Sequence, residues 1–593
     1  MKKPLLFTFF FILGCFMANA QWNNDPEVNN LITPLGAGTY AFDLQVSKDG
    51  STFVSYVRPM GGNIASLLQI IDKDGNMMFS DEGLTVSHKN TISWTAVGDL
   101  MFLDRDGNAI IAVTDCRNAE HATDDVGYSL YKVSPTGEML WGEDGIDLSG
   151  GKAYNLVACM AMTQLEDGSY VCAWSVTVYI DELHSRTHIQ LQRISPTGEL
   201  LWKEEEMRLY NSSFDYEYPY LVSAGNNQVI LMFVRGAGRI LTAKKIDFDG
   251  SNVWAEDVTI YSGGFTIPPL YVILKIIPDQ MGGAFVGWYD DRNWENKEST
   301  YVAHLTAEGR LGFASGEGGE KIGYNEFLRG FQPQMYFDKE EGFLYIVWRE
   351  TSQGQSWQQI TAQKMKIPSG ELMWDPNGIE IVPLIEQSVL QYSIQSDGNG
   401  NMALFFSSSV YDPEYYYSWD VNSVTLFDPK GEYVWKDEIV QFATFPSMKD
   451  NLVSTPPIDN NFWITAWSDE RKIDGDPGGS KKIYLQRVNI DGTLGDNGIS
   501  VKENKFAEPS FTVIPTVVNR PAQFYISTEK AGKADISLYS IMGQKMETIF
   551  SGMLQNGNNT ISWNPQKSRL SNGVYIATLT TDTGKKSLRI IVQ

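Results

Sequence analysis

The sequence predicts an all-β protein: an eight-bladed, or alternatively seven-bladed, β-propeller followed by a small C-terminal Ig-like β-sandwich. Three observations predict this fold. A segment of roughly 60 residues recurs eight times between residues 30 and 500, each copy consists of short apolar runs between glycine turns, and the pattern changes after Pro509. One four-stranded sheet per repeat is typical of a propeller, because radial repetition lets each sheet bury both faces against its neighbours.

Each repeat carries a turn of the kind found in SPTGEMLW (134–141), which returns as SPTGELLW (195–202) and PSGELMW (368–374). A second Gly or Asn turn precedes it and leads into apolar β-formers, as in EDGSYVCAWS (166–175). This pattern is typical of a hairpin that leads into a buried strand. Two such turns per repeat predict about four short strands. The first kind of turn has its glycine at Gly75, Gly137, Gly198, Gly250, Gly309, Gly370, Gly431 and Gly492.

In seven of the eight repeats an aromatic residue stands four positions after the turn glycine. The even spacing places these rings on one side of their strand, where a large flat ring would wedge against the neighbouring sheet. The T-G-x-x-x-W spacing resembles the tryptophan-docking repeat of quinoprotein-type propellers, and this resemblance implies the architecture only. We therefore expect a structural role for Phe79, Trp141, Trp202, Trp254, Phe313, Trp374 and Trp435.

The N-terminal segment has the pattern of a secretory signal peptide. Lys2 and Lys3 precede an apolar run over residues 5–16, and Ala18-Asn19-Ala20 supplies small residues for cleavage, so residues 1–20 are expected to be removed. A lipoprotein-type site at Cys15 is the alternative, and the A-x-A pattern fits better. No later stretch is apolar for long enough to form a transmembrane segment. The formal net charge of −25 argues against a nucleic-acid partner, since phosphate binding needs a surplus of Lys and Arg.

After Pro509 the sequence reads as short alternating strands that end at the last residue, which is typical of a small β-sandwich. It contains ISLY (536–539), ISW (561–563), NGVY (572–575) and a basic final stretch (585–593). These elements resemble the type A C-terminal sorting domain of the Bacteroidota type IX secretion system. One departure is Thr516, where the family commonly has Asn. The resemblance assigns the family motif to Pro515, Gly543, Trp563, Gly573 and Tyr575.

The resemblance implies a division into three parts: the signal peptide at 1–20, the propeller at 21–505 and the sorting domain at 509–593. It also implies that the type IX secretion machinery is a partner, which carries the protein through the outer membrane by recognising the tail. The expected location is the outer-membrane surface or the extracellular space. The sequence leaves surface anchoring and release as equal alternatives.

Catalytic and metal-binding motifs are absent from the sequence. It has no G-x-S-x-G, H-E-x-x-H or P-loop pattern, and His184 and His188 fall on a turn-like stretch that predicts surface-loop histidines. Cys116, Cys159 and Cys172 lack C-x-x-C spacing, so we expect no zinc site and either one disulfide or buried thiols. We expect no cofactor. Acidic turns such as DKDG (72–75) resemble half of a Ca²⁺ loop but lack its closing Glu, which leaves Ca²⁺ as the one weak alternative.

Two features are candidates for ligand binding. An Asp and an Arg two positions apart follow three of the buried strands, where they could pair with each other or face a ligand at the rim. The segment YDPEYYYSWD (411–420) is a long aromatic loop that would either fold back as a cap or present a sugar- or protein-facing surface. The candidate residues are Asp115, Arg117, Asp290, Arg292, Asp469, Arg471, Tyr416, Tyr417 and Trp419.

These observations favour a secreted or cell-surface binding protein whose propeller presents its loops to a glycan or protein. The alternative is a secreted polysaccharide- or peptide-degrading enzyme with its active site at the propeller channel. An enzyme of the glycosidase kind would bring two carboxylates to within about 5–10 Å of each other. A propeller by itself does not decide between the two, because the fold hosts both functions. In the absence of a catalytic motif we expect binding without turnover.

Overall fold

The protein is described by a computed structural model that divides the chain into two compact units, Met1–Asp496 and Asn497–Gln593. Both are all-β within the described residues, and the single helical element there is a 3-10 turn, η1 (Pro565–Lys567). The signal-peptide residues lie outside the described part. The structure describes residues 22–33, 40–60, 63–89, 100–117, 126–152, 154, 156–181, 184–203, 207–236, 238–263, 274–292, 297–412, 417–472, 481–496, 510–514, 517–518, 521–528, 531–540, 544–568, 570–581 and 584–592.

The described residues of the first unit form eight antiparallel sheets, numbered here in chain order. Sheets 1 to 4 consist of β2 (Tyr40–Val46), β3 (Thr52–Met60), β4 (Asn63–Ile71) and β5 (Leu84–Ser87); β6 (Leu100–Leu103), β7 (Ala109–Asp115), β8 (Gly127–Val133) and β9 (Ile146–Asp147); β10 (Leu156–Gln164), β11 (Tyr170–Tyr179), β12 (Ser185–Ile194) and β13 (Arg208–Leu209); and β14 (Tyr216–Ser223), β15 (Val229–Arg235), β16 (Ile240–Ile246) and β17 (Val258–Tyr261).

Sheets 5 to 7 repeat this order, and sheet 6 has one additional strand, β26. Their strands are β18 (Lys275–Pro278), β19 (Ala284–Asp290), β20 (Ser299–Leu305) and β21 (Glu320–Lys321); β22 (Arg329–Asp338), β23 (Phe343–Thr351), β24 (Trp357–Lys366), β25 (Glu371–Leu372) and β26 (Ile379–Glu386); and β27 (Ser388–Ser396), β28 (Met402–Asp412), β29 (Tyr417–Phe427) and β30 (Val440–Ala443).

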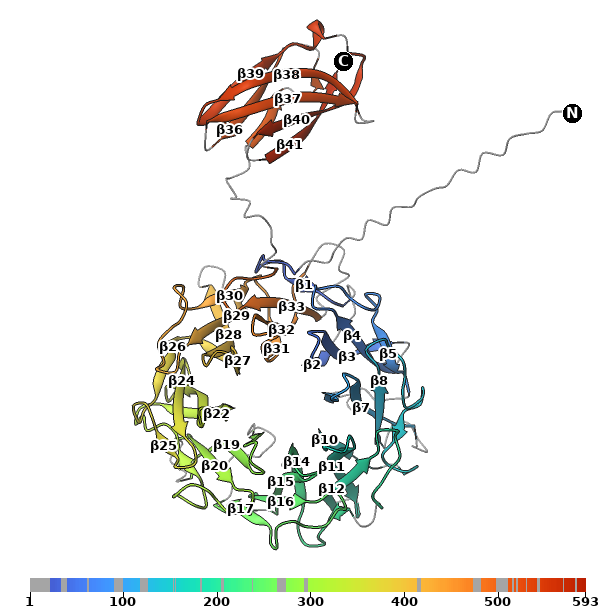
Figure 1. Cartoon of the computed structure of the whole chain (residues 1–593), viewed down its shortest axis with the longest axis vertical. Helices are drawn as coiled ribbons and strands as arrows, with labels where there is room; N and C mark the ends of the chain where they lie inside the picture. The colour runs from blue at the N-terminus through green and yellow to red at the C-terminus, as the bar shows by residue number, and fades with distance from the viewer. Residues whose placement is uncertain are drawn as a thin grey trace, which may run out of the picture. The chain divides into compact units, whose positions relative to one another are not determined.

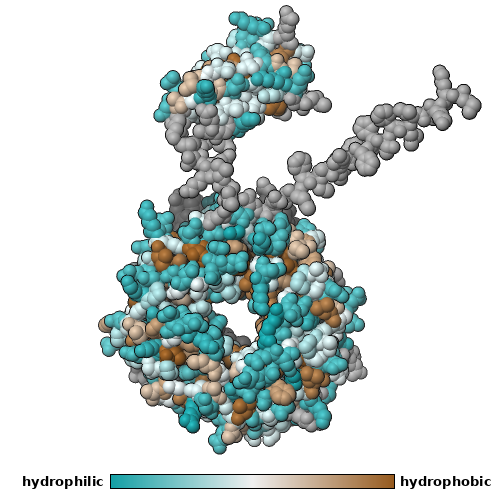
Figure 2. Space-filling view, in the orientation of Figure 1, coloured by the Kyte–Doolittle hydropathy of each residue, from teal (hydrophilic) through white to brown (hydrophobic). Residues whose placement is uncertain are grey.

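Sheet 8 differs because its outer strand comes from the other end of the chain. β31 (Lys449–Ser454), β32 (Phe462–Asp469) and β33 (Lys482–Asn489) are followed in the sheet by β1 (Asn30–Leu31). Asn30 pairs with Leu485, and Leu31 pairs with Tyr484. Figure 1 shows the sheets of this unit arranged in a circle, with β2, β10, β14, β22, β27 and β31 nearest to its centre. The space-filling view in Figure 2 shows a central opening there. The first unit is therefore propeller-like.

Each sheet buries both of its faces against the sheets before and after it. Along β7, Ile110 and Ala112 pack toward sheet 3, whereas Ala109 and Ile111 pack toward sheet 1. This alternation explains why the second strand of each repeat is an almost continuous apolar run. Among the described residues, eight apolar clusters lie between successive sheets, and one of them joins sheet 8 to sheet 1.

The repeat aromatics contact the turn of the next repeat. The indole Nε1 of Trp141 donates to the carbonyl of Pro196 at 3.2 Å, and Trp254 donates to Ala307 at 2.9 Å. Trp202 and Trp435 donate in the same way to Phe248 and Ile490, at 3.1 and 2.8 Å. Each acceptor stands two residues before a turn glycine. The tryptophans thus link consecutive sheets by a hydrogen bond as well as by packing.

The other three repeat aromatics, Phe79, Phe313 and Trp374, contact the next repeat by packing. A Cβ at Gly137 would lie 2.8 Å from the ring of Phe79, and a Cβ at Gly370 would lie 3.0 Å from Phe313, so these rings cover the next turn closely. Trp374 packs edge-on against Tyr345 and Phe427 instead. At this junction Ile379 of the additional strand β26 stands over Gly431.

The second unit is a sandwich of two sheets. One sheet contains β34 (Ser510–Ile514), β36 (Ala522–Thr528) and β39 (Gly557–Trp563), and the other contains β35 (Val517–Val518), β41 (Gly584–Val592), β40 (Gly573–Thr581), β37 (Gly532–Ser540) and β38 (Lys545–Leu554). Trp563 and Tyr575 lie in the core between the sheets. Gly573 begins β40, whereas Pro515 and Gly543 lie outside the described residues. No helix in the described part of either unit is long and apolar enough to cross a membrane.

Candidate functional site

The three Asp–Arg pairs are internal ion pairs at the ends of β7, β19 and β32. Arg471 contacts Asp469 at 2.7 Å, Arg117 contacts Asp115 at 2.8 Å, and Arg292 contacts Asp290 at 3.2 Å. The aspartate side chains are at most 1% exposed. Two of the aspartates also accept a tryptophan indole N–H at 3.0 Å. Trp288 donates to Asp290, and Trp467 donates to Asp469.

The arginines of these pairs also bind within the fold. Their guanidinium groups stack on Tyr131, Tyr301 and Tyr484 of the next strand. They donate to backbone carbonyls of the segment that leads to the outer strand: Arg117 to Asp144 at 2.7 Å, Arg292 to Gly318, and Arg471 to Glu27 at 2.9 Å. Because these contacts use the charged groups inside the sheets, the geometry favours the ion-pair interpretation over a ligand-facing one.

The acidic turns are hairpin turns held by their own carboxylates. Asp72 Oδ1 accepts the backbone N–H groups of Asp74 and Asn76, at 2.9 and 2.8 Å. Asp104 makes the same contacts with Asp106 and Asn108. Among the residues that the structure describes, no group of three or more His, Cys, Asp or Glu side chains could hold a metal ion. The DGDPGG loop (474–479) lies outside them.

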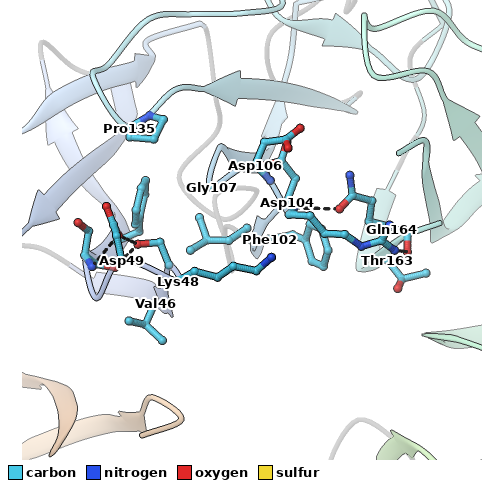
Figure 3. A pocket seen from close by; sticks show the side chains of 15 residues that line it. Val46, Lys48, Asp49, Phe102, Asp104, Asp106, Gly107, Pro135, Thr163 and Gln164 are labelled. Carbon is cyan, nitrogen blue, oxygen red and sulfur yellow. Dashed lines mark hydrogen bonds between the residues drawn. The ribbon is translucent and has the colours of Figure 1, made fainter. Parts of the chain in front are cut away.

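One pocket of about 480 Å³ lies where the turns of sheets 1, 2 and 3 meet (Figure 3). Two of its charged side chains, Asp104 and Arg105, already have partners in the fold. Asp104 accepts the phenol of Tyr170 at 2.8 Å and pairs with Lys132 at 3.1 Å, and Arg105 donates to the carbonyl of Glu166 at 3.2 Å. Figure 3 shows the side chain of Lys48 extending across this space. The pocket therefore offers a ligand few free polar groups.

A larger groove of about 880 Å³ lies between β26, the start of β27 and the long β28–β29 hairpin, and is called here the hairpin groove. Apolar side chains on its walls include Tyr411 and Ile385, which are 57% and 48% exposed. Ser408, Ser409, Ser418 and Ser423 line the hairpin side, where the hydroxyl of Ser409 donates to Asp420 at 2.6 Å. Among the described residues that line the groove, Glu386 is the one with a charge. Exposed aromatic and aliphatic surface beside hydroxyl groups is the usual composition of a ligand site.

The structure corrects the prediction of a long aromatic loop over residues 411–420. β28 continues to Asp412 and β29 begins at Tyr417, so Tyr411 and Trp419 are strand residues, and Trp419 is half-buried. Val410 pairs with Trp419, and Asp412 pairs with Tyr417. The physical reason is that aromatic side chains favour extended backbone when a partner strand is present. Tyr416 lies outside the described residues, as does the side chain of Tyr417.

The prediction of two surface-loop histidines is also partly wrong. His184 is exposed and contacts Asp181 at 2.8 Å, but His188 lies in β12 and is only 6% exposed. The DELHSRTH stretch contains the start of β12, and residues 188–192 of this strand are buried on both faces, so His188 is covered. Cys116 and Cys172 are buried, and the side chain of Cys159 lies outside the described part.

One carboxyl group on the first strand of sheet 1 has a pKa raised toward neutral pH. Asp43 lies on β2 and accepts the backbone N–H of Met101 in β6 at 3.0 Å. Burial raises the pKa of Asp43 to about 6, although the hydrogen bonds from Met101 and Leu44 oppose this change. A carboxyl group with this pKa exchanges its proton near neutral pH, as a general acid must.

Replacing Asp43 by Asn is expected to stabilise the protein at pH 7.5 and to have little effect at pH 4. The folded state binds the proton of Asp43 more tightly than the unfolded state does, so stability falls as pH rises from about 4 to about 6. Asn carries no charge and so removes the cost of burying the ionised carboxylate. We place this cost at about 1–2 kcal/mol, because the side chain is partly solvated. Thermal unfolding of both proteins at the two pH values tests this, and an equal gain at pH 4 would contradict it.

Comparison with known proteins identifies the C-terminal unit. Residues 520–593 match the family model of the Secretion system C-terminal sorting domain. This match confirms the type IX sorting tail predicted from the sequence motifs. The protein is therefore exported, to the outer-membrane surface or the extracellular space. No curated protein matches the chain in sequence.

Solved structures resemble the chain only distantly. A polysaccharide lyase of the ulvan lyase type is 10% identical, with 81% of this chain and 98% of the lyase covered and a TM-score of 0.39. The Dos1 propeller is also 10% identical, with 77% and 95% covered and a TM-score of 0.39. An α-L-arabinanase of Penicillium chrysogenum is 12% identical, with 57% and 94% covered and a TM-score of 0.31.

Proposed function

We propose that the protein is an exported binding protein: an eight-bladed β-propeller that binds a glycan in the hairpin groove and is delivered by its sorting tail. The observation that carries the binding role is the hairpin groove itself. Its lining includes Tyr411, which is 57% exposed, and serines of the hairpin, around a space of about 880 Å³. The partner on the export side is the type IX machinery, which acts through the second unit.

Ring closure is the part of this proposal that concerns the fold. Two observations support it. The outer strand of sheet 8 is β1, which belongs to the N-terminal end of the chain, and Ile464 and Leu485 of sheet 8 share an apolar cluster with Val54 and Leu67 of sheet 1. A ring closed in this way leaves no exposed sheet face between its ends. The eight sheets would then be eight blades.

The composition of the groove favours a glycan over a protein as the ligand. The face of an aromatic ring packs against the C–H groups of a sugar, and serine hydroxyls and side-chain amides exchange hydrogen bonds with sugar hydroxyls. In this proposal Tyr411 supplies the ring, serines of the hairpin other than Ser409 supply hydroxyls, and Gln441 supplies an amide. Among the described lining residues Glu386 is the one carboxylate, and a lining of this kind suits a neutral glycan better than a strongly anionic one.

The replacement of Tyr411 by Ala is expected to weaken glycan binding at least tenfold. The change removes the exposed ring from the groove and leaves the strand pairing of β28 intact, because the backbone still pairs with Ser418. A tenfold loss corresponds to about 1.4 kcal/mol, which is within the range for one aromatic contact. The mature protein is applied to an array of purified polysaccharides, and affinity for the best polymer is then measured for both proteins.

Tyr179→Ala is the matched control, because Tyr179 is a 65% exposed tyrosine at the end of β11 in another sheet. Its affinity should equal that of the unchanged protein. Equal weakening by both variants, or none by Tyr411→Ala, would remove the groove as the site. Binding confined to a parallel protein array would make the ligand a protein. Release of product from any polymer would overturn the binding-protein proposal.

A second candidate function is the polysaccharide- or peptide-degrading enzyme with its site at the channel. The observation in its favour is Asp43, whose pKa of about 6 leaves part of the carboxyl protonated near neutral pH. If the protein is such an enzyme, Asp43→Asn should abolish turnover of the polymer while leaving its affinity unchanged. Turnover that survives the substitution would exclude Asp43 as the acid.

A further inference from the structure

The N-terminal segment, residues 22–33, lies at the junction of the first and last sheets. The side chain of Trp22 is only 2% exposed and belongs to the apolar cluster that contains Val54 and Ile464. Its indole Nε1 donates to the carbonyl of Lys73 at 3.0 Å. Trp22 is therefore a buried aromatic side chain that contacts sheet 1 from outside the regular repeat.

The contact of Trp22 repeats the pattern of the other tryptophans. Lys73 stands two residues before the turn glycine Gly75, as Pro196 stands before Gly198 and as Ile490 stands before Gly492. Four tryptophans from the preceding repeats donate to this same carbonyl in repeats 3, 4, 5 and 8. In repeat 1 the donor is Trp22, which comes from the beginning of the chain.

The eighth repeat lacks an aromatic residue of its own at this position. Four residues after Gly492 the chain has Asp496. The Oδ2 atom of Asp496 accepts the backbone N–H of Trp22 at 3.0 Å, and its Oδ1 pairs with Arg487 at 2.9 Å. Asp496 stands where the other repeats have their aromatic residue. It binds the main chain of Trp22, the residue that makes the aromatic contact in its place.

The remainder of the segment is held by side chains of the last two sheets. Arg471 donates to the carbonyls of Glu27 and Val28 at 2.9 and 3.1 Å. The side-chain amide of Asn29 donates to the carbonyl of Phe442 at 2.7 Å and to Gln486 Oε1 at 2.8 Å. Arg471 thus binds main-chain carbonyls at a turn of the segment, and Asn29 of the segment binds the last two sheets in return.

We propose that the space between sheet 8 and sheet 1 is a peptide-binding site whose ligand is the chain's own N-terminal segment, with Trp22 as its anchor. Trp22 supplies the docking indole that the eighth repeat lacks, β1 supplies the fourth strand, and Arg471 clamps the main chain between them. The inference rests on the ring closure proposed above and is independent of the ligand in the hairpin groove. Arg471 and Glu27 are 444 residues apart, so the site forms only after the last repeat has been made.

The experiment cuts the segment free from an otherwise complete, folded protein. A protease site replaces residues 34–39, which connect β1 to β2, and the mature chain is cleaved after folding. We expect the N-terminal piece to remain bound on gel filtration. A labelled synthetic peptide of residues 21–33 should then exchange with it and give a measurable affinity.

The substitution is made in the peptide, so that the receiving protein stays unchanged. The Trp22→Ala peptide should bind about 100-fold more weakly, because it loses a buried ring and its hydrogen bond. The Val28→Ala peptide is the control, since Val28 is 51% exposed, and it should bind like the natural sequence. Immediate loss of the cleaved piece, or equal binding of the Trp22→Ala peptide, would overturn the proposal. If the cleaved protein retains the N-terminal piece but neither it nor the uncleaved protein binds a glycan, only the hairpin-groove proposal is refuted.

Discussion

Removal of residues 510–593 is expected to stop the protein in the periplasm. The signal peptide would still carry the chain across the inner membrane, but the sorting domain that the outer-membrane machinery recognises would be missing. The truncation should leave the first unit folded, because the two units are separately compact and have separate apolar clusters. Cell fractionation of the producing bacterium should show the shortened chain in the periplasm and almost none on the surface or in the medium.

A gain-of-export experiment serves as the control for this truncation. A periplasmic reporter that carries residues 497–593 at its C-terminus should reach the surface or the medium, while the reporter alone stays in the periplasm. The control separates loss of the address from damage to the protein that carries it. If the truncated chain leaves the cell as well as the complete chain does, the second unit is not the export signal.

Asp469→Ala is expected to destabilise the first unit by about 3–5 kcal/mol, the usual cost of leaving a buried charge without its partner. Asp469 is fully buried and accepts the Trp467 indole at 3.0 Å, the Ser447 hydroxyl at 2.6 Å and the Arg471 guanidinium at 2.7 Å. The substitution would leave Arg471 buried without its carboxylate. Arg471 also holds the N-terminal segment, so the damage should extend to the closure of the ring. Denaturant unfolding of both proteins measures the difference.

The pH dependence of this loss follows from the proton affinity of Asp469. Burial alone would raise the pKa of Asp469, but the hydrogen bonds and charge of Arg471 hold it below its ordinary value. The pair therefore stabilises the folded state above the unfolded pKa near 4, and this contribution falls as pH decreases through the lower, folded-state pKa. The difference in unfolding free energy between the two proteins should accordingly narrow in strong acid.

Asp144→Asn is the matched control, because it removes an aspartate from an exposed ion pair. Asp144 pairs with Lys89, and their side chains are 77% and 36% exposed. Solvent screens such a pair, so the change in unfolding free energy should be much smaller than that caused by Asp469→Ala. A loss from Asp469→Ala no larger than that from Asp144→Asn would mean that the buried pair contributes nothing to the fold.

The sequence predicted the strands of the first unit well because their causes are local. Glycine turns fix the hairpins, and runs of β-branched and aromatic residues fix the strands between them. Gly137, with a φ of 88°, adopts a backbone conformation that other residues rarely accept. A glycine recurs at this turn position in every repeat, at an almost constant spacing. The motif residues Trp563 and Tyr575 likewise indicated the sorting domain without any knowledge of its core.

The hairpin groove was not predicted, because it depends on strand lengths and on an additional strand. The aromatic residues near 411–420 drew attention to the region, but they indicated a loop. The groove exists because β28 and β29 extend farther than the strands around them and because β26 pairs with β24. The run of serines at 407–409 in an otherwise apolar strand is the signal that could have pointed to it.

The sequence alone determined that this protein is exported and that it is built from one repeated sheet, since a sorting motif and a turn are read from neighbouring residues. Only the tertiary structure decided how the last repeat is completed. Nothing local connects Trp22 with Lys73 or Arg471 with Glu27, because each pair meets only when sheets from opposite ends of the chain pack together. The eighth repeat lacked its aromatic, and the residue that takes its place stands at the other end of the chain.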